Sequence, residues 1–105
     1  MGMSRELQET LANANVRYSS EGFVILGIFG SRARGDNGPD SDLDILYQLR
    51  PDFMEKYPGW NTAARVDEIK QELAQMIGLN IDLADRDALR PLAQHFILPE
   101  TVYVA

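Results

Sequence analysis

Two aspartates, Asp42 and Asp44, stand two residues apart in an alternating stretch, "SDLDILYQL" (41–49). If this stretch is a strand, both carboxylates leave the same face, with Cα atoms roughly 7 Å apart. Carboxylates held so close repel each other, and a cation would offset the repulsion. Mg²⁺ or Mn²⁺ suits such a pair, because these ions take few protein oxygens and complete their coordination with water and substrate phosphate. The alternative is an exposed strand end at which the pair caps a turn.

A third aspartate, Asp82, lies between two apolar residues in "NIDLAD" (80–85), which predicts a short strand. Its apolar neighbours point to the opposite face of that strand. If this strand adjoins the previous one, Asp82 comes up beside Asp42 and Asp44. Three carboxylates on one sheet face indicate metals, and two bridged ions could activate an attacking oxygen and stabilise a leaving phosphate.

A glycine-serine turn precedes the aspartate pair. Gly30 ends the apolar run "FVILGIF" (23–29), where it allows a close backbone approach. The residues from Ser31 to Arg34 predict one turn of helix, whose free N–H groups would offer an anion site. The Ser31 hydroxyl could donate to a phosphate oxygen, and Arg32 or Arg34 could neutralise one. By itself the glycine-serine pair is a weak signal, because turns use both residues constantly.

The elements that must position these residues alternate between helix and strand. Ser4 can cap a first helix, whose apolar residues recur every four positions and which fades near "NVRYSSEG". Gly78 is a natural C-cap for a long amphipathic helix. The full expectation is a helix from Ser4, strands at 23–29, 41–49 and 80–85, an irregular connection at 50–61, helices from about 62 to 77 and at 90–97, and an edge strand at 101–104. This order predicts a single α/β (α+β) domain over 1–105, a sheet with helices packed on it.

Composition excludes several classes of protein. The 105 residues are 45% hydrophobic and 25% charged, as in globular domains, and length allows one core. A net charge of −6 argues against stable nucleic-acid binding, which needs clustered cations. Cysteine is absent, so disulfides and thiolate metal sites are excluded. No apolar leader or membrane span is visible, so a cytoplasmic domain is expected.

Other side chains have structural interpretations that we favour over functional ones. His95, the only histidine, is expected to be a packing group at or near the surface, not a ligand. Trp60 and Tyr57 are expected to anchor their loop to the core rather than to stack on an adenine. Phe53 and Met54, if exposed, would form a partner-binding patch with Tyr57. Three cations are expected on solvated helix faces: Arg65, Lys70 and Arg90.

The glycine-serine pair, a spacer of ten residues and the Asp42-x-Asp44 pair together resemble the nucleotidyltransferase signature. "NIDLAD" (80–85) resembles the third-carboxylate strand of the same family, after one intervening helix. The whole chain resembles the minimal nucleotidyltransferases of the polymerase-β-like superfamily. These are small domains often paired, as antitoxins, with a helical HEPN-type ribonuclease toxin.

The resemblance implies a role for each matching residue. Gly30 and Ser31 would hold the β and γ phosphates of ATP, Asp42 and Asp44 would bind two Mg²⁺ or Mn²⁺ ions, and Asp82 would complete the second metal site and help activate the acceptor hydroxyl. AMP would pass to a tyrosine of the HEPN-type toxin, and pyrophosphate would leave. The implied fold is a small mixed sheet of three to four strands with helices packed on it.

Two other functions stay open at this point. The chain could be an antitoxin that neutralises its partner by binding and occluding it, with nucleotide chemistry secondary. It could also transfer nucleotides to an antibiotic-like small molecule, although the lack of a second helical domain counts against this. A homo-oligomer is compatible with every one of these functions.

Overall fold

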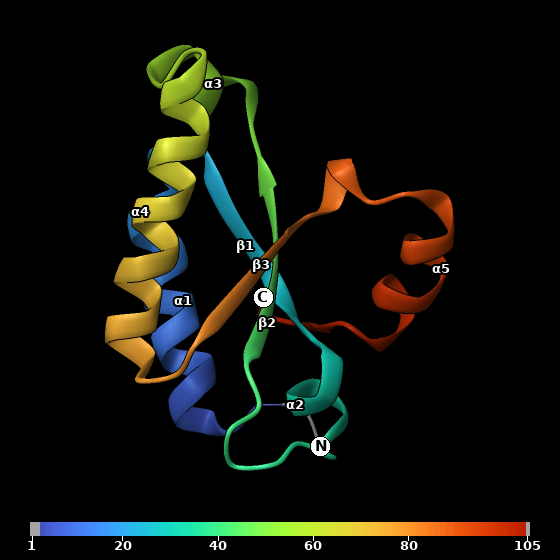
Figure 1. The fold of residues 1–105 in the computed structure, drawn as a ribbon. Coiled ribbons are helices and arrows are strands. Elements are labelled where there is room, and N and C mark those ends of the chain that lie inside the picture. The colour runs from blue at the N-terminus through green and yellow to red at the C-terminus, as the bar shows by residue number, and fades with distance from the viewer. Residues whose placement is uncertain (1–2, 105) are drawn as a thin grey trace.

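A four-stranded mixed sheet with helices on both faces forms the fold of the computed structural model, which describes residues 3–104 (Figure 1). The strand order is β3-β2-β1-β4, with β2 parallel to β3 and β1 antiparallel to both β2 and β4. The predicted mixed sheet with packed helices is therefore confirmed. The elements are α1 (Arg5–Ser19), β1 (Phe23–Phe29), α2 (Gly30–Arg34), β2 (Leu43–Leu49), α3 (Pro51–Lys56), α4 (Trp60–Ile77), β3 (Ile81–Asp85), a 3₁₀ turn (Arg86–Ala88), α5 (Pro91–Glu100) and β4 (Val102–Tyr103).

Helices α1 and α4 cover one face of the sheet, and α5 stands apart on the other side (Figure 1). Ser4 caps α1 as predicted, because its hydroxyl accepts the Leu7 N–H at 3.1 Å. Leu11 is fully buried below that turn, and Ile69 and Leu73 of α4 are buried against the same core. Within residues 3–104, no helix combines the length and apolarity that a membrane span requires.

The central strand β1 contains a bulge that sets its pattern of burial. Ile25 pairs with Tyr47 and Gly27 pairs with Leu46, so that Leu26 is the extra residue. Ile25 and Ile28 are both buried although they are three positions apart. Gly27 also lets β4 approach, since a Cβ there would collide with the Val102 carbonyl. The bulge therefore adjusts the register so that the end of β1 aligns with the start of β2.

The segment 50–61 was predicted to be irregular, and this prediction is wrong. It contains the helix α3, with Pro51 in its first turn, where no N–H donor is needed. Phe53 is fully buried in the core, so it belongs to no surface patch, whereas Met54 is 46% exposed. A short helix forms here because one turn is enough to bury Phe53 and a proline begins it.

Of the two aromatic residues expected to anchor this segment to the core, only one does so. The Tyr57 hydroxyl donates to Glu21 at 2.6 Å, and its ring packs against Phe53, so anchoring is confirmed for Tyr57. Trp60 is 93% exposed at the start of α4, and the same expectation is wrong for it. His95 is exposed with its ring edge-on to Phe96, as expected of a surface packing group.

Arg65 was expected on a solvated helix face, and this too is wrong. Its side chain is only 15% exposed and donates to both carboxylate oxygens of Glu21, at 2.8 and 2.7 Å. It also donates to Glu72, whose other oxygen accepts the Tyr18 hydroxyl at 2.5 Å. The hydrogen bond from Arg65 is the largest of the effects that lower the pKa of Glu21 to about 2. This network ties α1, the α1–β1 turn and α4 together beside the core.

Replacing Glu21 by Gln should lower the free energy of unfolding by about 2 to 3 kcal/mol at neutral pH, because Arg65 loses its paired charge. The folded pKa lies below the ordinary value of 4.5, so the stabilisation exists above that pH and is lost as pH falls toward 2. Urea unfolding of both proteins should therefore converge in acid. Glu9→Gln, which removes an exposed ion pair with Arg5, should change the free energy of unfolding little. Equal losses for the two variants would contradict the role of the network.

Candidate active site

One row of paired residues runs across the sheet and brings two of the predicted aspartates together. Phe29 of β1 pairs with Asp44 of β2, and Asp44 pairs with Asp82 of β3. Directly paired residues point to the same face, so the two carboxylates lie side by side. The neighbouring row is fully apolar, with Ile28 and Ile45 completely buried against the helices. Asp44 therefore faces away from α1 and α4, whereas Asp82, on the edge strand β3, also borders the cavities beside α4.

Asp44 shows the electrostatic consequence of this arrangement. Burial raises the pKa of its carboxyl, and the negative charges of Asp82 and then Asp42 raise it further. The opposing influence of Arg34 is the smallest. No hydrogen bond to the side chain of Asp42, Asp44 or Asp82 is present in the part of the chain that the structure describes. These are acidic oxygens that a cation would stabilise.

Asp42 lies just before β2 rather than within it, since the strand begins at Leu43 and not at residue 41. It is exposed, and it lines a cavity of about 320 Å³ together with Asp82. The three carboxylates are not closed into a ligand set: among residues 3–104, no three acidic or histidine side chains are placed to hold one ion together. The sheet brings the aspartates to one region without placing all three side chains around one point.

Gly30 begins α2 next to this acidic row. Its φ of +77° is a left-handed conformation that disfavours side chains, and a Cβ there would collide with the Asp44 carboxylate. The Gly30 N–H donates to Glu100 at 3.0 Å, and Ser31 is half-buried one residue later. The predicted glycine-serine turn therefore lies directly against the aspartates.

Both arginines of the spacer have partners within the chain. Arg32 donates to the carbonyl of Ser41 at 2.8 Å and closes the loop before β2. Arg34 bonds Asp36 at 3.1 Å and Glu100 at 3.0 Å. The predicted phosphate contacts of these arginines stay predictions, and in this structure the two side chains hold the loop and α5 in place.

Glu100 is the residue that sequence reasoning missed. It is the last residue of α5, yet its two oxygens accept from the Gly30 amide and from Arg34, about seventy positions earlier. It also adds to the negative charge around Asp44. No local motif marks it, because only the return of α5 toward α2 creates the contact.

The donor set fits a hard divalent cation. All three side chains offer oxygen, which Mg²⁺ and Mn²⁺ prefer, and burial, together with repulsion from the neighbouring carboxylates, raises the pKa of Asp44. Beside them, the Gly30 turn leaves no room for a side chain. A cation held next to a tight glycine turn at the start of a helix suits a phosphate-bearing molecule.

An acidic row beside a tight glycine turn, on a mixed sheet, defines an enzyme that transfers phosphate-linked groups. Comparison with known proteins identifies the transferred group as a nucleotide. The nucleotidyltransferase domain family matches residues 20–104. The chain belongs to this family and is a minimal nucleotidyltransferase domain.

Two relatives are similar over three quarters or more of the chain. The protein adenylyltransferase MntA of Thermococcus cleftensis is 33% identical over 98 residues, 91% of each chain. A Methanocaldococcus jannaschii protein assigned as a protein adenylyltransferase is 28% identical over 82 residues, covering 75% of this chain and 74% of its own.

Two solved structures share the fold. A structure assigned as a minimal nucleotidyltransferase superposes with a TM-score of 0.72 at 25% identity, covering 92% of this chain and 91% of its own. A chain from the crystal structure of a toxin–antitoxin with AMP-PNP superposes with a TM-score of 0.67, covering 93% of this chain and 72% of its own. At 17% identity, the second likeness shows the fold alone.

Gly30→Ala should reduce nucleotidyltransferase activity by about 100-fold, because the new methyl displaces the Asp44 carboxylate. Gly78→Ala is the matched control: its φ of +79° is nearly the same, but nothing lies within 4 Å of its Cβ. Both variants should lose about 1 kcal/mol to backbone strain, and only Gly30→Ala should lose activity. Equal activities of the two variants, measured alongside unfolding curves, would show that the close approach of Gly30 to Asp44 is dispensable.

Asp44→Asn should stabilise the metal-free protein at neutral pH, by the order of 1 kcal/mol, because it removes a charge that burial and the neighbouring carboxylates disfavour. A raised folded pKa favours folding in acid and disfavours it at higher pH, so the gain should shrink as pH falls. Adding Mg²⁺ should raise the melting temperature of the wild type and leave that of Asp44→Asn unchanged. An equal rise in both would place the ion elsewhere.

Proposed function

We propose that this nucleotidyltransferase transfers AMP from ATP to a hydroxyl of a partner protein. The observation that carries the proposal is the row from the Gly30 turn through Asp44 to Asp82, which sets a phosphate-binding turn beside acidic oxygens. An enzyme needs these two features next to each other to place a triphosphate and to neutralise its charge.

Asp42, Asp44 and Asp82 would hold one or two divalent ions, Mg²⁺ or Mn²⁺, which supply charge neutralisation at the phosphates and favour loss of the hydroxyl proton. Gly30 and Ser31 bind the β and γ phosphates through backbone N–H groups and the serine hydroxyl, and the phosphate takes the place of Glu100 at the Gly30 N–H. Arg32 and Arg34 are further cations. The acceptor oxygen forms a bond to the α phosphorus, the bond to the β phosphate breaks, and pyrophosphate leaves. Asp82 receives the acceptor proton.

The proposed acceptor is a tyrosine of a HEPN-type toxin, which the protein would silence as an antitoxin. Support comes from the name of the Thermococcus relative, a protein adenylyltransferase, and from the toxin–antitoxin neighbour with AMP-PNP. The HEPN-type identity of the partner and the choice of tyrosine as acceptor rest on the resemblance to the nucleotidyltransferase signature. A cytoplasmic setting accords with ATP as substrate and with the absence of cysteine.

Incubation with ATP, Mg²⁺ and the HEPN-type product of the adjacent gene should add whole AMP units to that partner, as measured by intact mass. Asp42→Asn should abolish the addition, and EDTA should do the same to the wild type. Glu55→Gln, at an exposed position of α3, is the matched control.

Two outcomes would contradict the proposal. Neutralisation of the partner by Asp42→Asn, without any mass change, would identify an antitoxin that acts by occlusion. Unmodified partner in the presence of folded wild-type protein, ATP and Mg²⁺ would exclude AMP transfer to it.

A further inference from the structure

Two cavities along the outer edge of β3 form one groove. The larger, of about 520 Å³, lies between α4 and the β2–β3 side of the sheet. The smaller, of about 320 Å³, continues along the start of β3. Lys70 and Asp82 line both cavities, so the two join where Asp82 stands. We refer to this pair of cavities as the β3–α4 groove.

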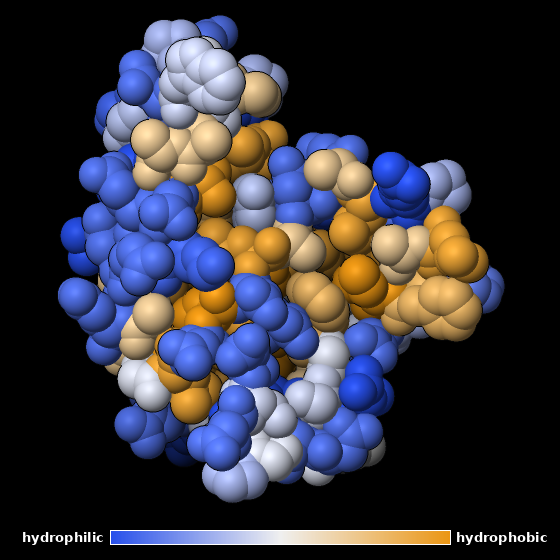
Figure 2. Space-filling model, in the orientation of Figure 1, coloured by the Kyte–Doolittle hydropathy of each residue, from blue (hydrophilic) through white to orange (hydrophobic). Residues whose placement is uncertain are grey.

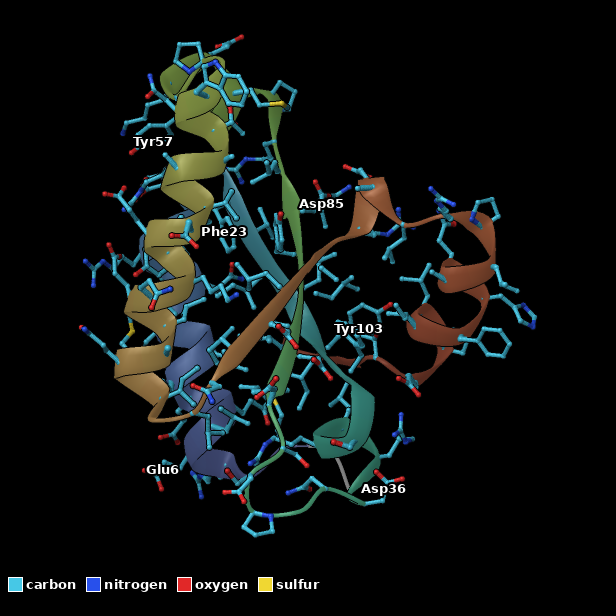
Figure 3. The ribbon with its side chains drawn as sticks, viewed as in Figure 1. Glu6, Phe23, Asp36, Tyr57, Asp85 and Tyr103 are labelled. Carbon is cyan, nitrogen blue, oxygen red and sulfur yellow. The ribbon has the colours of Figure 1, made fainter. Side chains whose placement is uncertain are left out.

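The groove has an apolar floor and an acidic rim. Val66 of α4 and Leu83 of β3 line the floor, and Figure 2 shows apolar surface in the hollow between α4 and the sheet. Asp67 lines the helix side and Asp85 the strand side, where Figure 3 shows it near the end of β3. Lys70 is the single cation among the lining residues. The lining therefore suits a ligand with an apolar body and positive ends.

The position of the groove follows the order of groups across the sheet. The Gly30 turn follows β1, Asp44 stands on β2, and Asp82 stands on β3, the last strand on that side within residues 3–104. In phosphoryl-type transfer the attacking and leaving oxygens lie roughly in line on opposite sides of the phosphorus. With pyrophosphate leaving at the Gly30 turn, the attacking hydroxyl arrives from the side of β3, where the groove reaches Asp82.

We infer that the β3–α4 groove receives the acceptor as an extended polypeptide segment, whose aromatic hydroxyl residue reaches Asp82 and whose flanking residues are cationic. The inference rests on the proposed transfer to a protein hydroxyl. Asp67 and Asp85 attract the flanking cations, and Val66 and Leu83 pack against the ring. The outer backbone edge of β3, unpaired by any strand among the described residues, offers main-chain hydrogen bonds to such a segment.

The same groove suits the nucleotide poorly. No residue of the turn 30–34 lines either cavity, and neither does Asp44. The acidic rim would also repel a triphosphate. The nucleotide and the acceptor therefore occupy opposite sides of the aspartate row.

Two synthetic peptides test the inference, each with a central tyrosine, one flanked by lysines and the other by glutamates. In NMR titrations of the ¹⁵N-labelled protein, the lysine peptide should shift amide signals of α4 and β3, and the glutamate peptide should not. With ATP and Mg²⁺, the lysine peptide should also receive AMP at least about tenfold faster. Asp67→Lys should weaken binding and transfer of the lysine peptide by about tenfold.

Glu68→Lys is the matched control, because it makes the same charge change one residue along α4, at a side chain that is 66% exposed and outside the groove lining. Glu68 does contact Arg65, so both variants are compared with the wild type by unfolding curves as well. Equal effects of the two variants, or lysine-peptide shifts away from α4 and β3, would overturn the inference. The inference would also be overturned if AMP shifted the amide signals of the groove residues and the lysine peptide did not. If AMP still reaches the toxin partner in those cases, only the groove assignment fails; loss of all AMP transfer from ATP would instead contradict the proposed function.

Discussion

The site depends on a conflict between apolar packing and charge repulsion in two adjacent rows of the sheet. Burial of Ile28, Ile45 and their neighbours against the helices fixes the register of β1, β2 and β3. Each fully buried side chain of this size contributes about 1.5 to 3 kcal/mol. Two like charges about 4 Å apart repel by about 1 kcal/mol in water and about 4 kcal/mol near a protein surface, which several buried side chains together exceed. The core therefore determines the register, and Asp44 and Asp82 are held together although they repel each other.

The same register explains why a glycine is needed at residue 30. Because Phe29 pairs with Asp44, the next residue of the chain turns directly over the Asp44 carboxylate. Only a residue without a side chain fits that approach, and its left-handed φ also favours glycine. Glu100 and Arg34 then hold the turn against α5. The turn and the acidic row are thus one structural unit rather than two adjacent features.

Helix α4 links this unit to the rest of the molecule. Its inner residues pack in the core, and Arg65 joins it to Glu21 in the α1–β1 turn. Its outer residues form one wall of the β3–α4 groove. Rigid placement of α4 is therefore what gives the groove a defined width beside Asp82.

The sequence by itself determined the elements and the chemistry of the site. Alternation, apolar periodicity and capping residues predicted the strands and the long helices within a few positions, and the spacing from Ser31 to Asp42 predicted the family. These signals are local, so one chain segment carries each of them. The short helix α3 was missed, because a single turn stabilised by burial of Phe53 leaves no periodicity to read.

Only the tertiary structure decided which groups meet. The pairing of Asp44 with Asp82 needs the parallel alignment of β2 and β3, and the partners of Arg65 and Glu100 lie tens of residues away. An isolated arginine on a helix predicts a solvated charge, because helix position does not show what another segment places beside it. Composition and spacing therefore specified the acidic oxygens and the turn, while strand register, set by the packing of the core, decided that they share one face.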